Sequence, residues 1–356
     1  MSDKRREFED IRQEIGKLDA QLLSALERRG TLSKRVGDLR RQMSLAAPLP
    51  ERASIEALVE RASGDMPESA LREIFREIVA TCSSLEQPVS VAYCGIEGGF
   101  AHAAARSRFG VSATFAGADT VAEAIDQVTR QRAAYAVVPF ETRADGLLQS
   151  TIAALTESEA KIVGAFEFVV NLQLASRASH VDGVERVFAV ARDRADCQKF
   201  LAAQLPKATV VDAPSPRAAC ELAASDARAA ALVHEGFMAE FSLDTLVRNV
   251  ADAGDERIRY AIAGMRPSSR SGGDLTGLVF AVNDSPGALH EVLRQFADRG
   301  VNLTKIQSRP SPGDSWQYLF FIEVQGHATD RPIVGAIEDV RRLSKFLKVL
   351  GSYQLA

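Results

Sequence analysis

The sequence predicts a multidomain protein with an all-helical segment at 1–87, an α/β domain at 88–265 and a ferredoxin-like domain at 275–356. Three observations support this division. Apolar residues recur at helical spacing through the first segment, and strand and helix patterns alternate in the second. The last segment reads strand, helix, strand, strand, helix, strand, which is the ferredoxin-like order. A polar Ser/Gly linker at 266–274 precedes it.

Composition and charge exclude several classes of function. The 356 residues carry a net charge of −4, and the N-terminal MSDKRREFED is too charged for a signal peptide. We therefore expect neither a nucleic-acid partner nor a membrane partner. The four cysteines form no CxxC pair and no Cys/His cluster with zinc spacing, which predicts reduced thiols in a cytoplasmic protein without metal or cofactor: Cys82, Cys94, Cys197 and Cys220.

The first apolar stripe spans about 40 residues, which corresponds to a helix about 60 Å long. Its members lie three or four residues apart, with one gap between 25 and 32: Phe8, Ile11, Ile15, Leu18, Leu22, Ala25, Leu32, Val36, Leu39 and Met43. Such a helix is too long to be buried within an 87-residue monomer, so we expect a partner chain to cover it. PLPE at 48–51 ends the helix, a second helix carries Ile55 to Ala62, and a third begins near Met66.

Four charged residues lie on or beside the apolar faces of these helices. Arg29 occupies the gap in the first stripe, and Arg12 and Arg40 flank the stripe. Glu86 follows Cys82 by one turn on the buried face of the third helix. Snorkelling or interface ion pairs would explain one such arginine. Three arginines and a carboxylate favour an anionic ligand, because unpaired buried cations cost several kcal/mol each.

The segments IRQEIGKLDAQLLSALERRGTLSKRVGDLR and FREIVATCSSLEQP resemble the first and last helices of the all-helical chorismate mutase domain, an intertwined dimer. The resemblance implies that Arg12 and Arg29, one from each protomer, hold the carboxylates of chorismate. Arg40, where the family has lysine, and Glu86 would lie at the ether oxygen, and Arg52 would contribute from the second helix. Such a site rearranges chorismate to prephenate by holding the compact conformer and stabilising charge at the ether oxygen.

The α/β domain begins with VSVAYCG, FAHAAARSRFG, AEAIDQVTR and AYAVVPF, read as strand, helix, helix and strand. Further strands are expected at 162–175, 184–191 and 230–233. Small ligands bind at the carboxyl ends of strands in α/β domains, so the turn VPFETRADGLLQS at 138–150 is a candidate site. Within it, Asp145 and the glycine that follows are expected to form a turn and a helix N-cap.

VAYCGIEGGFAHAAARSRFG at 91–110 resembles the first strand, loop and helix of prephenate dehydratases. With the mutase-like segment before it and the domain after it, the whole chain resembles the bifunctional mutase/dehydratase (P-protein) family of phenylalanine biosynthesis. This implies a two-lobed dehydratase domain. The positions that correspond to the family's cleft motifs are Glu141, Thr142, Arg143, Arg192, Ser215, Ile258 and Arg259.

These cleft positions depart from the family's chemistry. Prephenate dehydration couples loss of carbon dioxide to loss of the ring hydroxyl, and the leaving hydroxide needs a proton donor. Ile258 replaces the family's threonine and offers no proton. Arg143, Arg192 and Arg259 would make the cleft cationic and suited to a dicarboxylate. Glu141 could serve as the acid only with a raised pKa, and arginine neighbours lower the pKa of a carboxyl group.

The C-terminal segment resembles the ACT regulatory domain through its GAL and QSRP motifs. The resemblance implies that ACT domains pair side by side and that an amino-acid effector, phenylalanine in this family, binds between them. The implied effector residues are Gly287, Ala288, Leu289, Gln307, Ser308, Arg309 and Pro310. Gln307 replaces the family's glutamate. The alternative is a small dimerising module without a ligand.

Three functions stay open from the residues. The first is the bifunctional enzyme, a homodimer or higher homo-oligomer that converts chorismate to prephenate and then to phenylpyruvate, with feedback through the ACT domain. The second is a diverged enzyme, with or without mutase activity, that acts on prephenate with a different outcome, such as decarboxylation without aromatisation. The third is a non-catalytic amino-acid-sensing subunit.

Overall fold

The computed structural model describes residues 2–43, 52–143, 145–234, 238, 240–252, 254, 256–310 and 318–355. The chain forms two compact units. The first contains the residues up to Val89 together with Arg108–Thr114, and the second contains Ser90–Ser107 and the residues from Phe115 onward. None of the helices in the described ranges combines the length and the apolar character needed to cross a bilayer.

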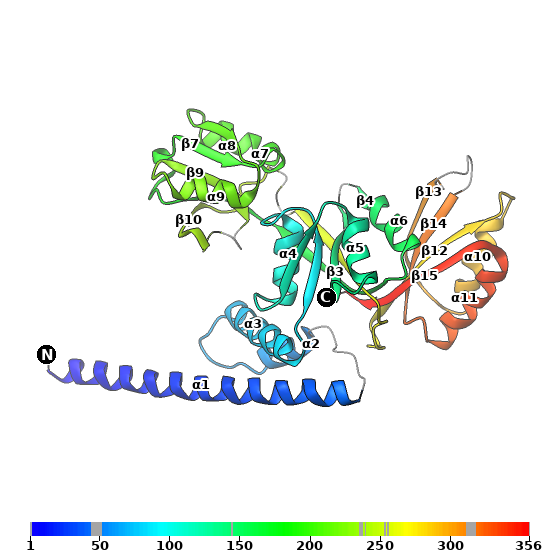
Figure 1. Ribbon diagram of the computed structural model, residues 1–356, viewed down its shortest axis with the longest axis horizontal. Coiled ribbons are helices and arrows are strands. Elements are labelled where there is room, and N and C mark those ends of the chain that lie inside the picture. The colour runs from blue at the N-terminus through cyan, green and yellow to red at the C-terminus, as the bar shows by residue number, and fades with distance from the viewer. Residues whose placement is uncertain are drawn as a thin grey trace. The chain divides into compact units, whose positions relative to one another are not determined.

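The first unit is built from three helices: α1 (Ser2–Gln42), α2 (Arg52–Val59) and α3 (Glu68–Glu86). α1 is 41 residues long and confirms the predicted long helix. α2 and α3 lie beside the half of α1 that leads to its C-terminal end (Figure 1). α2 ends three residues before Ala62, because Ser63 and Gly64 follow and disfavour helix. The predicted break at 48–51 lies outside the described residues.

The apolar stripe of α1 is open to solvent along most of the helix. Its large side chains are between 39% and 65% exposed: Phe8, Ile11, Ile15, Leu18, Leu22, Leu23, Leu26, Leu32, Val36, Leu39 and Met43. A contiguous exposed apolar surface of this extent is typical of a protein–protein interface. The apolar face of α1, which a partner chain is predicted to cover, is therefore not covered by the described residues of this chain.

The second unit begins with an α/β lobe whose strand order is β2-β1-β3-β11-β5, with β4 paired to β3. β1 runs parallel to β3, whereas β11 is antiparallel to β3 and to β5. The helices of this lobe are α4 (Phe100–Phe109), α5 (Val121–Thr129) and α6 (Gln149–Glu157). The strands are β1 (Ser90–Cys94), β2 (Thr114–Ala118), β3 (Tyr135–Thr142), β4 (Gly146–Leu147), β5 (Lys161–Val170) and β11 (Glu256–Gly264).

A second lobe is inserted between β5 and β11. Its strand order is β10-β6-β9-β7-β8, in which β7 is parallel to β8 and β9. The strands are β6 (Leu172–Ser176), β7 (Arg186–Ala189), β8 (Thr209–Asp212), β9 (Ala229–His234) and β10 (Asp244–Val247). The helices are η1 (Val181–Gly183), α7 (Ala191–Asp196), α8 (Gln198–Gln204) and α9 (Pro216–Ala224).

The predicted strand at 162–175 is wrong as a single element. The chain changes sheet at Asn171, which separates β5 in the first lobe from β6 in the second. Apolar residues run almost without interruption on both sides of Asn171, so hydrophobic periodicity cannot reveal the change of sheet.

The last part of the chain has the predicted βαββαβ order, with strands arranged β13-β14-β12-β15 and every pairing antiparallel. Its elements are β12 (Asp274–Val282), α10 (Ala288–Ala297), β13 (Leu303–Pro310), β14 (Tyr318–Gln325), α11 (Arg331–Leu343) and β15 (Ser344–Gln354). One face of the sheet packs on the two helices through Leu278, Phe280, Val292, Phe296 and Ile337.

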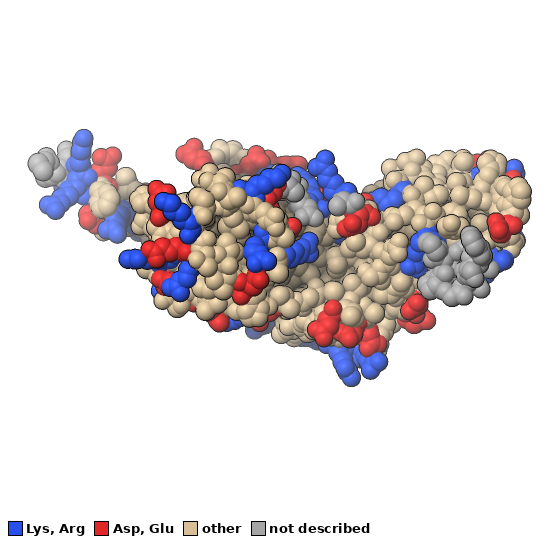
Figure 2. Space-filling model, turned by 90° about the horizontal axis from the view of Figure 1, so that it is seen from above, with Lys and Arg blue, Asp and Glu red and all other residues tan. Residues whose placement is uncertain are grey.

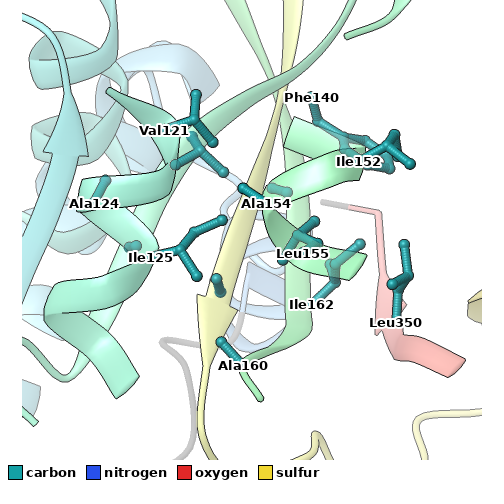
Figure 3. Packing of buried hydrophobic residues seen from close by; sticks show 14 of the residues in the cluster. Val121, Ala124, Ile125, Phe140, Ile152, Ala154, Leu155, Ala160, Ile162 and Leu350 are labelled. Atoms are coloured by element: carbon teal, nitrogen blue, oxygen red, sulfur yellow. The ribbon is translucent and has the colours of Figure 1, made fainter. Parts of the chain in front are cut away.

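The other face of this sheet shares a hydrophobic core with the first α/β lobe. Figure 3 shows Val121, Ile125, Leu155 and Ile162 of that lobe in one cluster with Leu350 of β15. Val279, Phe321 and Tyr353 belong to the same cluster. The C-terminal domain and the first lobe are therefore joined by a continuous core, and burial of that core holds them together.

The backbones of β15 and β5 approach closely at the edge of this core. A Cβ atom on Gly351 would lie 2.2 Å from the carbonyl oxygen of Ile162, and Gly351 has a φ of +147°. Nearby, Lys161 Nζ donates to the Val349 carbonyl at 2.8 Å. Position 351 therefore requires glycine both for its backbone conformation and for space.

We expect Gly351→Ala to lower the free energy of unfolding by about 2 kcal/mol or more, because the methyl group must displace backbone and the φ value is strained. Differential scanning calorimetry would measure the change as a lower melting temperature. Gly273→Ala is the control, since its Cβ would meet nothing nearer than 4.0 Å. Equal melting temperatures for the two variants would contradict the prediction.

Candidate functional site

Arg40 and Glu86, predicted as neighbours, meet where the C-terminal ends of α1 and α3 pack together. Arg40 Nη1 lies 3.3 Å from Glu86 Oε2, and the two side chains are 29% and 19% exposed. Gly37 permits this approach, because a Cβ there would lie 2.2 Å from the Glu86 carbonyl oxygen. Arg41 donates to the same carbonyl at 2.9 Å. The first unit therefore presents a partly buried cation and carboxylate together, a donor and an acceptor for a polar ligand.

The other predicted residues of this unit are distributed along α1 and α2. Arg29 donates to the Ile78 carbonyl of α3 at 3.3 Å. Arg12 is exposed, with its guanidinium 5.5 Å from the centre of the Phe8 ring. Arg12 and Arg29 are seventeen positions apart on the helix, which is about 25 Å at 1.5 Å per residue. Arg12 therefore cannot join the others within one chain. Arg52 begins α2, and its side chain lies outside the described residues.

The candidate turn of the second unit joins β3 to β4. Asp145 donates its backbone N–H to Thr142 Oγ1 at 2.9 Å, and the Thr142 hydroxyl donates to the Asp145 carboxylate at 3.1 Å. Gly146 follows with a φ of +66°. The predicted turn is confirmed, but Asp145 is not a helix N-cap. α6 begins only at Gln149, with Leu148 in the capping position, because the two residues of β4 intervene.

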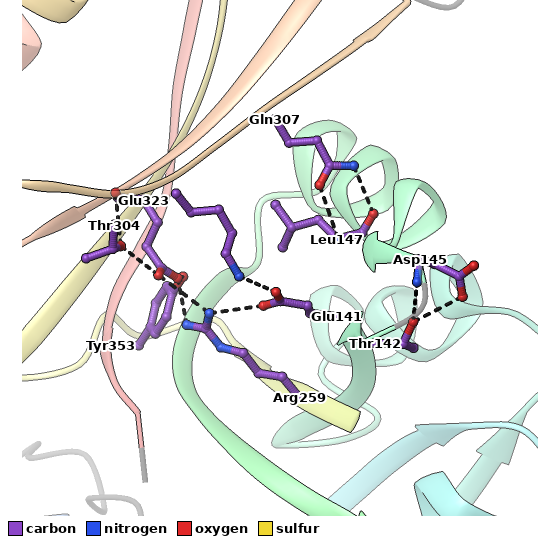
Figure 4. Close-up of polar contacts among 10 residues, drawn as sticks. Glu141, Thr142, Asp145, Leu147, Arg259, Thr304, Gln307, Glu323 and Tyr353 are labelled. Carbon is purple, nitrogen blue, oxygen red and sulfur yellow. Dashed lines mark hydrogen bonds and ion pairs between the residues drawn. The ribbon is translucent and has the colours of Figure 1, made fainter. Parts of the chain in front are cut away.

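Arg259 lies buried at the junction of the first lobe with the C-terminal domain, only 8% exposed (Figure 4). Its Nη2 is 2.6 Å from Glu323 Oε2, and its Nη1 is 3.4 Å from Glu141 Oε2. Lys305 pairs with the other oxygen of Glu141. Tyr353 donates to Glu323 at 2.8 Å. We call these five residues the Arg259 cluster.

The charges of the Arg259 cluster balance one another. Burial alone would raise the pKa of Glu323, but the hydrogen bond and charge of Arg259, together with hydrogen bonds from Tyr353 and Thr304, lower it below its ordinary value. Burial, and then the charge of Glu323, raises the pKa of Tyr353 well above its ordinary value. The tyrosine is therefore a neutral donor to a buried carboxylate that faces a buried guanidinium.

The structure thus brings Glu141, Thr142 and Arg259 together on adjacent strands, as β11 pairs Arg259 with Glu141 and Ile258 with Thr142. Arg259 and Glu141 are bound in ion pairs with the C-terminal domain, which differs from the predicted role of Arg259 as a substrate-binding cation. Arg143 is exposed in the same turn.

The remaining predicted cleft residues come from the second lobe. The Arg192 guanidinium lies 5.4 Å from the centre of the Phe100 ring of the first lobe. Ser215 caps α9, accepting the Ala218 N–H at 3.1 Å. The next residue, Pro216, would lie 3.1 Å from a Cβ on Gly98, so the lobes meet where α9 faces the loop before α4.

On the face of the molecule drawn in Figure 2, acidic and basic side chains are interspersed.

Alternation along β13 divides the predicted effector residues between the two faces of the C-terminal sheet. Gln307 lies opposite Phe321, which belongs to the core shared with the first lobe. Ile306 lies opposite Ile322, which belongs to the core under the helices. Gln307 and Arg309 consequently face the first lobe, whereas Ser308 faces the helical side.

The GAL motif lies at the start of α10, on the helical side of the sheet. It comprises Gly287, Ala288 and Leu289, and Gly287 adopts the left-handed conformation with a φ of +84°. The side chain of Pro310 lies outside the described residues. Within one chain the structure therefore does not gather the seven predicted effector residues into one group, because a strand presents successive side chains to opposite faces.

Sequence reasoning missed Lys305, Glu323 and Tyr353, which complete the Arg259 cluster. One signal was present. Glu323 interrupts the apolar strand YLFFIEVQ, and a carboxylate at a core position needs a buried partner.

Asp193, in α7, was also missed. It is 5% exposed, and burial raises its pKa to about 7 although the neighbouring Arg192 lowers it in part.

Comparison with known proteins matches each part of the chain to a protein family. The family models for chorismate mutase type II, prephenate dehydratase and the ACT domain match residues 11–87, 91–268 and 276–342. The bifunctional chorismate mutase/prephenate dehydratase of Aquifex aeolicus is 36% identical, over 98% of both chains.

Two solved structures resemble three quarters of the chain. The prephenate dehydratase of Arthrobacter aurescens, in complex with L-Phe, is 30% identical with a TM-score of 0.64, covering 75% of this chain and 90% of that one. GqqA, described as a novel type of quorum quenching acylase, is 26% identical with a TM-score of 0.64, covering 75% of this chain and 98% of that one.

We expect Asp193→Asn to become more stable relative to the unsubstituted protein as pH rises. In the unsubstituted protein, the folded state keeps a proton on Asp193 that the unfolded chain releases. The free energy of unfolding of that protein therefore falls as pH rises from about 4 to about 7, and the loss is complete above pH 7. The amide does not titrate. The relative gain should reach about 4 kcal/mol at most, measured as melting temperatures from pH 5 to pH 8. Asp182→Asn, at an exposed position, is the control. A difference that does not change with pH would contradict the prediction.

Proposed function

The chain belongs to the family of bifunctional chorismate mutase/prephenate dehydratases, and we propose that it converts chorismate to prephenate and prephenate to phenylpyruvate. The observation that carries the first reaction is the Arg40–Glu86 pair, a donor and a carboxylate in partly buried surroundings at the ends of two helices. The helical residues 1–87 would act as the mutase, residues 88–265 as the dehydratase, and residues 275–356 as the regulatory domain.

The mutase reaction needs no nucleophile, because chorismate rearranges within one molecule. The protein has to hold the dianion in its compact conformer and stabilise the negative charge that develops at the ether oxygen. Arg40 supplies a donor to that oxygen, and its pairing with Glu86 fixes the direction of the guanidinium. Arg29, anchored on α3 through the Ile78 carbonyl, binds one carboxylate of the substrate.

The second carboxylate requires Arg12 of a partner chain. Arg12 and Arg40 are 28 residues apart on α1, about 40 Å along a straight helix. The exposed apolar stripe of α1 supports an antiparallel pairing with a second copy, which would bring the partner's Arg12 end beside Arg29 and Arg40. The functional protein is then a homodimer or a higher homo-oligomer.

In the dehydratase, the two carboxylates of prephenate would bind Arg143 and Arg192, the predicted cations that do not belong to the Arg259 cluster. Ser215 accepts the Ala218 N–H with its oxygen, so its own O–H remains able to donate a hydrogen bond to the departing ring hydroxyl. Glu141 and Arg259 would position the turn and β11 and would not contact the substrate.

A second candidate reaction follows from Ile258. It is 4% exposed, pairs with Thr142 and has no proton to assist departure of the hydroxide. Decarboxylation of prephenate with retention of the ring hydroxyl would need no proton at that oxygen; the electron pair released with carbon dioxide would instead take up a proton at a ring carbon.

We also propose a cytoplasmic location and phenylalanine as the effector. Cys82, Cys94, Cys197 and Cys220 all carry free thiols, which suits a reducing compartment. The Arthrobacter aurescens prephenate dehydratase is similar to this chain and was crystallised with L-Phe. The effector would bind on the helical side of the C-terminal sheet, near Gly287 and Ser308.

Purified protein supplied with chorismate should release phenylpyruvate, and chromatography would identify the product.

Arg40→Ala should lower the mutase kcat by about 100- to 1,000-fold through loss of a preorganised donor. It should leave the conversion of added prephenate unchanged. Arg35→Ala, at an exposed position of the same helix, is the control. Prephenate as the only product would leave the mutase alone, and a decarboxylated non-aromatic product would select the second candidate. Absence of turnover, with phenylalanine still bound in calorimetry, would select an amino-acid-sensing subunit.

Leu18→Asp should convert the oligomer to a smaller species in sedimentation velocity and should abolish mutase turnover, because it places a charge in the apolar stripe of α1. Gln13→Asp is the matched control, since it adds the same charge off the stripe. An unchanged sedimentation coefficient for Leu18→Asp, or an equal change for both variants, would contradict pairing through this face.

A further inference from the structure

Three side chains on one face of β13 contact the candidate turn of the first lobe. Lys305 pairs with Glu141, and Gln307 accepts the Leu147 N–H at 3.2 Å while donating to the Leu147 carbonyl at 3.4 Å. Arg309 donates to the Gln149 carbonyl at 3.2 Å. We call the contacts of Gln307 and Arg309 the β13 clasp, whereas the Lys305–Glu141 pair belongs to the Arg259 cluster. Figure 4 shows the Gln307 amide directed at the backbone of Leu147.

The segment held by the clasp forms part of the candidate cleft. Its Glu141 and Thr142 pair with Arg259 and Ile258 of β11. β4 folds back on the end of β3, where Leu147 lies opposite Glu141. A shift of Leu147 therefore moves the residues at the carboxyl end of β3, where the substrate is proposed to bind.

The two sets of contacts differ in how firmly they hold. The Arg259–Glu323 pair is buried, charged and 2.6 Å long. The hydrogen bonds of Gln307 and Arg309 are 3.2–3.4 Å long, near the upper limit for such bonds, and involve partly exposed side chains. The junction therefore combines a firm anchor at the Arg259 cluster with weaker contacts at the clasp. Such weaker contacts can be made and broken without separating the domains.

The amide of Gln307 suits this contact chemically. One peptide unit presents an N–H and a carbonyl at Leu147, and an amide side chain can serve both. A glutamate, present at this position in the family motif, could accept from the N–H but could not donate to the carbonyl. Glutamine in place of glutamate at position 307 therefore removes a charge and allows two hydrogen bonds to the peptide groups of Leu147.

We propose that the β13 clasp is the contact through which the C-terminal domain controls the dehydratase, with Gln307 as a positioning residue for the 141–149 segment. This rests on the proposed function. Ser308 and the start of α10 lie on the helical side of β13, whereas Gln307 and Arg309 hold the segment from its other side. A ligand that shifts β13 from the helical side changes the clasp directly, since adjacent residues of one strand move together.

Gln307→Met tests the proposal, because it removes both hydrogen bonds and keeps a side chain of similar length in the apolar surroundings. Ile306→Met is the matched control. It introduces the same side chain on the opposite face of the same strand, where Ile306 is 48% exposed. Hydrogen-exchange mass spectrometry on overlapping peptides reports the Leu147 amide, and turnover of prephenate with and without phenylalanine reports the coupling.

We expect Gln307→Met to raise the exchange rate of the Leu147 amide about fivefold or more. The ratio of kcat/KM without phenylalanine to kcat/KM at saturating phenylalanine should fall about fivefold or more. Ile306→Met should change neither quantity. Retention of the wild-type ratio in Gln307→Met would overturn the proposal, as would an equal loss of coupling in both variants.

The exchange measurement also separates this proposal from the proposed function. If the unsubstituted protein forms no phenylpyruvate, the proposed dehydratase activity is rejected. The hydrogen-exchange rate of the Leu147 amide, measured with and without phenylalanine, then tests whether the effector acts on the β13 clasp. A change in protection that disappears in Gln307→Met supports it, and protection that phenylalanine does not alter overturns it.

Discussion

The buried ion pair between Arg259 and Glu323 is the interaction on which the second unit depends. The two residues come from different domains, and without Arg259 the carboxylate of Glu323 would be an uncompensated buried charge, at a cost of about 3–5 kcal/mol. The shared core beneath them adds apolar burial through Phe321, Leu350 and Tyr353. The regulatory domain is consequently anchored to the dehydratase sheet, and any control it exerts must act through small shifts at that junction.

Much of the fold could be predicted from local patterns. The stripe of α1 and the βαββαβ order of the last domain follow from periodicity alone, because each is repeated over many residues. The change of sheet at Asn171 could not be predicted, since the apolar residues on its two sides look alike. The partners of Arg259 were hidden for a different reason, as Glu323 lies 64 residues away and pairs only in the folded state. The alternation of side chains along a strand could have predicted that Ile258 and Arg259 lie on opposite faces of the sheet, because they are adjacent residues of one strand.

The chemistry of this chain is less uniform than its architecture. The first unit has the Arg40–Glu86 pair that we propose acts on chorismate, whereas the proposed dehydratase cleft has Ile258, which carries no proton donor. A protein described as a quorum quenching acylase has a similar structure over three quarters of this chain. Function therefore has to be argued from the side chains of the cleft, because one fold supports different reactions.

The close contact of β15 with β5 has a consequence for the order in which the protein folds during synthesis. Gly351 lies against Ile162, and Leu355 bridges to Ala165, nearly 200 residues earlier in the chain. The first lobe cannot complete its core until β15 has left the ribosome. Until then Ile162 and its neighbours on β5 remain without their final covering. Contacts between such distant residues form slowly, so this lobe should reach its native state late in folding.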